Sequence, residues 1–274
     1  MRLGASTALA VRAESASAVE QVRASGGADL PLLVLLHGTR LNGAQWHAYG
    51  PLLQGVAELL APDLPGHGLR AGETFLLALA MQQLDELIAQ AGPRPVVLGG
   101  HSLGGYVAMC YAQQHPQRLA GLALMGCAAE PSGAGAWMYR QVARLWEAAG
   151  PDGMARLDAL WLGRVAHAPT WAAVRARGGD FEQIRLAWGE VMRHCGAHQL
   201  RQLACPVLLL GGSWDQLHIH ARRFAAAAPR AQIVTKPHRS HLWPVTHPHE
   251  VAAELRRWLQ HILARGDEPA GALR

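Results

Sequence analysis

The sequence predicts an α/β fold in which a doubly wound, mostly parallel sheet is interrupted by a helical insertion. Three observations support this prediction. Short apolar runs lead directly into glycine-rich turns, and stretches with the apolar period of a helix separate these runs. Half of the 274 residues are apolar and only 16% are charged, which is typical of a globular protein. Between about residues 130 and 198 the alternation of strand and helix stops, and the pattern becomes helical.

The expected strands are continuous apolar segments, because a strand of a parallel sheet is buried on both faces. The clearest segments are residues 32–36, 96–98 and 207–210, each of which precedes a glycine turn. Weaker strands are expected at residues 56–61, 119–125 and 231–235, which brings the sheet to about six strands. Before residue 28 the pattern is diffuse, and a hairpin of short strands is expected at residues 8–22.

Three amphipathic stretches predict helices between these strands, at residues 75–89, 106–114 and 251–263. The helical insertion contains five of the nine tryptophans. They either fill a small core of the insertion or line an apolar pocket beneath it. We therefore expect a core formed by residues 1–129 and 199–274, and a helical cap formed by residues 130–198.

Composition argues against several classes of function. No stretch approaches the roughly 18 unbroken apolar residues of a membrane span, and Arg12 and Glu14 interrupt the N-terminal segment before a signal-peptide core forms. The four cysteines have no C-x-x-C spacing, which favours reduced thiols over a disulfide framework. The net charge of +5 comes from dispersed arginines. We expect a cytoplasmic protein without nucleic-acid or membrane partners, of undetermined oligomeric state.

The strongest chemical motif is Gly100-His101-Ser102-Leu103-Gly104, which fits the pattern G-x-S-x-G. In this nucleophile elbow, glycines on both sides allow a tight turn that exposes the serine hydroxyl. The pattern alone is short enough to arise by chance. Its position between a buried strand and a helical stretch provides the required context, so Ser102 is the predicted nucleophile.

A serine hydroxyl needs a base to take its proton and an acid to orient that base. With this elbow the chain order is serine, acid and then histidine, each at the carboxyl end of a strand. Asp215 follows the strand at 207–210 and is the predicted acid, although a turn or helix-capping role would also place an aspartate there. Glu130, just beyond the strand at 119–125, is the alternative.

The base must be chosen among fifteen histidines. His241 follows the last expected strand and precedes the final helix, so we predict that it is the base. The pairs His218 with His220 and His247 with His249 are better explained as helix starts. Their spacing of two splays side chains apart, and no acidic cluster accompanies them, so no metal site is expected.

Hydrolysis of an acyl group also requires two backbone N–H donors for the developing oxyanion. One is expected from Leu103, the residue after the nucleophile, and the other from Thr39, in the turn after the first clear strand. Gly38 allows the backbone to turn closely there, although a plain turn would also use a glycine.

Together these segments resemble the α/β-hydrolase superfamily from about residue 32 to residue 263. The loop at residues 61–68, APDLPGHG, is similar to the D-x-P-G-x-G loop of that family, and the spacing of His241 to the prolines at 244 and 248 also matches. The resemblance implies the α/β-hydrolase fold and the same triad and oxyanion residues. Serine at the elbow argues against the haloalkane dehalogenase and epoxide hydrolase branches. The motifs do not specify a substrate.

The chain departs from the family pattern beside the oxyanion turn, where Arg40 follows Thr39 in place of a small or apolar residue. Its guanidinium is either a solvent-facing loop group or a fork for a substrate carboxylate or phosphate. Further candidates for substrate binding are three cap tryptophans, Trp137, Trp161 and Trp188.

The resulting expectation is a cofactor-free serine hydrolase that cleaves a small or medium carboxylic ester through an acyl-enzyme. A thioesterase, lactonase, carbon–carbon bond hydrolase or cofactor-free lyase would use the same triad. A small-molecule receptor on this fold is the alternative outside enzymes. Retention of every chemical group makes the receptor the weaker hypothesis.

Overall fold

The structure is a computed structural model that describes residues 30–178 and 183–266. Its centre is a six-stranded sheet in the order β2-β1-β3-β4-β5-β6, and every neighbouring pair is parallel. The strands are β1 (Leu32–Leu36), β2 (Glu58–Leu60), β3 (Val96–His101), β4 (Gly121–Met125), β5 (Val207–Gly212) and β6 (Ala231–Lys236). All six expected strands after residue 30 are therefore confirmed, whereas the expected hairpin at 8–22 lies outside the described residues.

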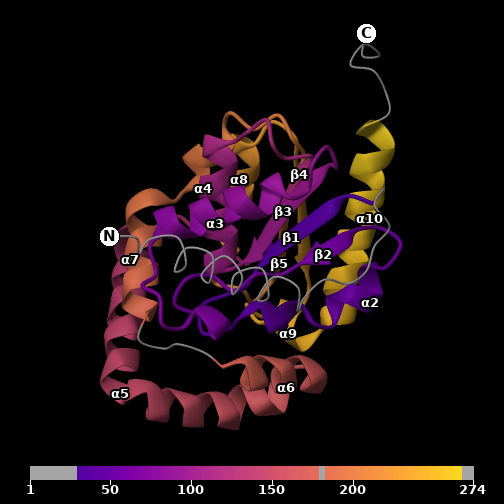
Figure 1. Cartoon of the computed structure of the whole chain (residues 1–274). Coiled ribbons are helices and arrows are strands. Elements are labelled where there is room, and N and C mark those ends of the chain that lie inside the picture. Colours follow the sequence, from indigo (N-terminus) through magenta and orange to yellow (C-terminus); the bar gives the residue numbers. More distant parts are fainter. Residues whose placement is uncertain (1–29, 179–182, 267–274) are drawn as a thin grey trace, which may run out of the picture.

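Helices cover both faces of the sheet (Figure 1). The α-helices are α2 (Tyr49–Leu53), α3 (Leu77–Ala89), α4 (Leu103–Gln114), α5 (Gly133–Val165), α6 (Ala168–Arg177), α7 (Ile184–His194), α8 (Ala221–Ala227), α9 (Trp243–Thr246) and α10 (Pro248–Gly266). Three short 3₁₀ helices are η1 (Gly43–Trp46), η2 (Gly68–Arg70) and η3 (Ala197–Leu200). The three helices predicted from apolar periodicity correspond to α3, α4 and α10, with ends shifted by a few residues.

Alternation along β1 explains why the sheet is covered on both faces. Leu32, Val34 and Leu36 belong to a core with α3, α4, α7 and α8. Leu33 and Leu35 belong to a second core with α2 and α10. Successive side chains of a strand point to opposite faces, so an uninterrupted apolar strand requires helices on both sides. The doubly wound α/β architecture predicted from the sequence is confirmed.

The order of the strands positions a site. From β1 the chain first adds β2 on one side and then returns to place β3 on the other side. In open parallel sheets, ligands bind beyond the carboxyl ends of the strands at such a switch point. The turn after β1 contains Thr39, and the turn after β3 contains Ser102. The topology therefore brings the predicted nucleophile and an oxyanion donor to the same edge.

Between β4 and β5 the described elements are α5, α6, α7 and η3, all helical. In Figure 1, α5 and α6 run along the lower edge of the view, below the sheet. Helix α5 contains a kink at Gly150, whose φ of 66° and ψ of 173° are not helical. Such values are accessible mainly to glycine, so this residue divides α5 into two segments. Among the described residues, none of the helices has the length and apolarity needed to span a bilayer.

Candidate active site

Ser102 occupies a strained turn between β3 and α4. Its φ of 54° and ψ of −116° lie outside the regions that residues with a side chain normally adopt. The turn is tight because a Cβ at Gly100 would lie 2.3 Å from the backbone of Gly104, and a Cβ at Gly104 would lie 2.5 Å from the carbonyl oxygen of Leu36. The Ser102 amide donates to the Met125 carbonyl at 2.8 Å, which fixes the turn against β4. The two motif glycines are thus required by close backbone contacts.

Asp215 and His241 form a hydrogen-bonded pair. Nδ1 of His241 lies 3.0 Å from Oδ1 of Asp215, which also accepts the Leu217 amide at 2.8 Å. Asp215 is only 4% exposed. Burial alone would raise the pKa of this carboxyl, but the hydrogen bond and charge of His241, with the Leu217 amide, outweigh it and lower its pKa below the usual value. An ionised Asp215 holds the proton on Nδ1 and leaves Nε2 as the acceptor.

Ser102 and His241 line one cavity of about 640 Å³, together with Thr39 and Leu103. The structure thus brings together all the side chains and amides that the sequence assigned to hydrolysis, from β1, β3, β5 and the turn after β6. Within the described part of the chain, the amides of Thr39 and Leu103 donate to no protein acceptor. Two unused donors at a cavity wall are suited to stabilise a negative oxygen.

A buried polar chain that the sequence analysis missed connects the oxyanion turn to the histidine loop. Oε1 of Gln45 accepts the Gly38 amide at 2.9 Å, and its Nε2 lies 3.1 Å from Nδ1 of His101. Nε2 of His101 in turn lies 2.9 Å from the carbonyl oxygen of His241. Burial is the main reason that the pKa of His101 is lowered to about 3, and the nearby His241 lowers it further. The ring of His101 is therefore neutral near pH 7. With Nδ1 accepting and Nε2 donating, His101 ties the two loops together.

Gly126 lies directly against the acid–base pair and provides a test of its geometry. A Cβ there would lie 2.8 Å from Oδ2 of Asp215 and 2.9 Å from Nδ1 of His241. We expect Gly126→Ala to lower kcat by about 10- to 100-fold, because the methyl group must displace one member of the pair. The measurement is steady-state hydrolysis of an activated ester together with urea unfolding.

Gly55→Ala is the matched control for this variant. Gly55 also has a positive φ, 75°, but an added Cβ meets nothing within 4 Å. Both variants should lose about 1–2 kcal/mol of folding stability through backbone strain, and only Gly126→Ala should lose activity. Equal kcat values in the two variants would show that the geometry around Gly126 is unimportant for activity.

The walls of the cavity are mainly apolar, and the segment 130–198 contributes a large share of them. Trp188 lines the cavity, and its Nε1 donates to Oγ1 of Thr39 at 2.9 Å. Trp161 also lines it, with a ring exposed enough to lie at the rim. Trp137 is 60% exposed and is not among the lining residues, so the structure does not bring it to the cavity. Trp146, which the sequence did not single out, lines the cavity.

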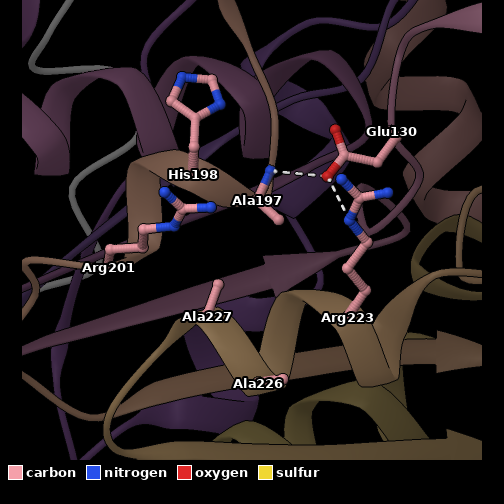
Figure 2. Close-up of a pocket in the computed structure, with 7 residues that line it drawn as sticks. All are labelled: Glu130, Ala197, His198, Arg201, Arg223, Ala226 and Ala227. Atoms are coloured by element: carbon pink, nitrogen blue, oxygen red, sulfur yellow. Dashed lines mark hydrogen bonds and ion pairs between the residues drawn. The ribbon is translucent and has the colours of Figure 1, made fainter.

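Glu130, the alternative acid, has other partners. Its Oε1 lies 3.2 Å from Nε of Arg223 and 3.3 Å from the amide of Ala197. Figure 2 shows these contacts at the wall of a second, smaller cavity of about 280 Å³, which His198 and Arg201 also line. The carboxylate of Glu130 is therefore engaged with Arg223, while Asp215 contacts the histidine. This arrangement favours Asp215 over Glu130.

Three further histidines that the sequence placed near helix starts, His218, His220 and His247, lie next to helices or in contacts away from the catalytic pair. His220 precedes α8, and its Nδ1 accepts the Glu130 amide at 3.0 Å, while Nε2 of His218 lies 3.0 Å from Oγ1 of Thr235. His247 precedes α10. Across residues 30–178 and 183–266, no group of three or more His, Cys, Asp or Glu side chains is arranged to hold a metal ion.

This fold and this arrangement define the class of protein. The model of the alpha/beta hydrolase family matches residues 33–254, and the chain belongs to that family. The family resemblance that the motifs carried is therefore confirmed.

Comparison with particular proteins adds detail. A segment of 96 residues is 44% identical to the pimeloyl-[acyl-carrier protein] methyl ester esterase of Edwardsiella ictaluri. The segment covers 35% of this chain and 36% of that protein. The match thus spans about a third of the length of this relative. Among solved structures, a thermophilic esterase from Thermogutta terrifontis is 25% identical with a TM-score of 0.67, over 87% of this chain and 92% of the other. MenH from S. aureus is 20% identical with a TM-score of 0.73, over 87% and 97%, which supports the fold alone.

Proposed function

We propose that the protein is a serine hydrolase that cleaves a carboxylic ester of small or medium size through an acyl-enzyme. The observation that carries the proposal is the position of Ser102 in a strained elbow, in the same apolar cavity as a histidine paired with a buried aspartate. If these residues only formed a surface turn, neither the backbone strain at Ser102 nor the burial of Asp215 would be needed.

In the proposed reaction, Oγ of Ser102 attacks the ester carbonyl carbon while Nε2 of His241 takes its proton. Asp215 keeps the other ring nitrogen protonated and stabilises the imidazolium that forms. The carbonyl oxygen becomes negative and accepts hydrogen bonds from the amides of Thr39 and Leu103. His241 then protonates the leaving alcohol, and water activated by the same ring releases the acid from Ser102.

The cavity and the relatives favour an ester of an aliphatic acid. Apolar side chains of the segment 130–198, including Trp146, Leu162 and Val191, line the cavity, which suits the burial of an acyl chain. We propose that this segment acts as a cap over the substrate. The similarity to pimeloyl-[acyl-carrier protein] methyl ester esterases makes medium-length acyl esters, including esters on a carrier protein, the first class to test.

A substrate panel tests the proposal. We expect the protein to hydrolyse p-nitrophenyl esters of C4 to C10 acids and to react covalently with a fluorophosphonate at Ser102. Acyl thioesters of the same lengths serve as the comparison, because the same triad also cleaves them. Faster turnover of the thioesters would replace the ester proposal with a thioesterase. Absence of both turnover and labelling would indicate a receptor that lacks an activated serine.

A further inference from the structure

A buried ion pair lies in the wall of the catalytic cavity, next to the oxyanion turn. Arg40, directly after Thr39, has a φ of 64° and forms an ion pair with Asp158 of the cap helix α5. The guanidinium carbon also lies 4.5 Å from the ring centre of Trp146. The side chains of Arg40 and Asp158 are 16% and 6% exposed. All three residues line the cavity, so the pair is part of the surface that a substrate meets.

The two charges are costly to bury separately. Removing one partner of a buried pair leaves the charge of the other partner uncompensated. Burial lowers the pKa of Arg40 to about 10, which still leaves it a cation near pH 7. At this point of the cavity wall, the carboxylate of Asp158 on α5 therefore offsets the charge of Arg40.

Asp158 has an oxygen that the protein does not use. The residue is 4% exposed, and its Oδ2 has no hydrogen-bond partner, while Oδ1 faces Arg40. A carboxylate enclosed beside the cavity repels a second anion. The sequence left open whether Arg40 binds a substrate carboxylate. In the structure a carboxylate already pairs with this guanidinium, and it belongs to the protein.

We propose that the Arg40–Asp158 pair determines substrate charge, so that the cavity accepts acyl chains without a free carboxylate and disfavours those that carry one. The inference rests on the proposed ester hydrolysis, because it concerns the acyl part of the same substrate. Asp158 is a specificity residue here and takes no part in the chemical step.

The test is Asp158→Asn, which removes the charge and nearly preserves the shape. Two esters of equal chain length are compared, p-nitrophenyl hexanoate and the mono-p-nitrophenyl ester of adipic acid, which ends in a carboxylate. We expect the kcat/KM of the wild-type protein to be at least about 100-fold higher for p-nitrophenyl hexanoate than for the adipate ester. In Asp158→Asn the preference should fall by at least about tenfold, because Arg40 then attracts the free carboxylate.

Two further variants separate charge from packing. The double variant Arg40→Leu/Asp158→Asn removes both charges. The increase in kcat/KM for the adipate ester that we expect in Asp158→Asn should be absent from this double variant. Asp152→Asn removes a carboxylate from an exposed position of the same helix and should leave the preference unchanged. A change of less than twofold in Asp158→Asn, or an equal gain in the double variant, would overturn the proposal.

A binding measurement keeps this inference distinguishable from the proposed function. In calorimetry, Asp158→Asn should bind hexanoate at least about tenfold more tightly than the wild-type protein does, with hexanamide as the neutral comparison. A protein that hydrolyses no ester but shows this gain would contradict the proposed activity and retain the charge-selective cavity. Hydrolysis of hexanoate esters, without tighter binding of hexanoate in Asp158→Asn, would support the proposed activity and contradict the charge-selective cavity.

Discussion

Ser102→Ala should lower kcat for ester hydrolysis by about 10⁴- to 10⁶-fold, which is the scale of loss when a nucleophile is removed from such a triad. The variant keeps the backbone turn but leaves His241 without a hydroxyl to activate. Labelling by a fluorophosphonate should disappear completely, and mass spectrometry of the labelled wild-type protein should place the adduct on the peptide that contains Ser102.

The control for this variant is Ser213→Ala, in the turn after β5. Ser213 accepts the His238 amide through Oγ and does not line the cavity. We expect nearly unchanged activity and full labelling. Loss of labelling in Ser213→Ala, with labelling retained in Ser102→Ala, would show that Ser102 is not the nucleophile. Unfolding in urea should show that both variants are folded.

Asp215→Asn should lower kcat by about 10⁴-fold with little change in the fold. An amide in this place can donate to Nδ1 of His241, which favours the wrong tautomer and leaves Nε2 carrying the proton. The pKa of Asp215 lies below its usual value because His241 stabilises the carboxylate, and the amide cannot stabilise an imidazolium in the same way. Steady-state kinetics on the preferred ester are the measurement.

Glu130→Gln is the matched comparison, since Glu130 is the other acid that sequence order allowed. Its carboxylate faces Arg223 and the Ala197 amide, so we expect less than about tenfold loss of kcat. A large loss in Glu130→Gln, together with a small one in Asp215→Asn, would exchange their roles. The pair of variants therefore decides which carboxylate assists the base.

The parts of this structure that the sequence predicted are those with a local signal. Strands β1, β3 and β5 read as apolar runs before glycines, and the contacts of Gly100 and Gly104 explain why their turn must contain them. Chain order alone predicts Asp215 and His241, and in the structure Oδ1 of Asp215 lies 3.0 Å from Nδ1 of His241. Chain order works here because parallel strands end at one edge of the sheet, so residues distant in sequence converge there.

The parts that the sequence did not predict depend on contacts between distant segments. Gln45 and His101 are 56 residues apart, and neither position alone indicates a hydrogen bond between them. Likewise, Arg40 meets Asp158 only because α5 folds back over the cavity. Nothing in the apolar spacing distinguishes Trp146 from Trp137, because tertiary packing determines how a helix is oriented over a pocket.

The backbone strain at Ser102 has a consequence for attempts to make this protein more robust. A residue held in such a conformation costs roughly 1–3 kcal/mol, and glycine is the residue that avoids most of that cost. A selection for heat resistance alone would thus favour glycine at the one position where a hydroxyl is needed for the proposed chemistry. Engineering for durability would have to hold this position fixed and seek its gains elsewhere in the chain.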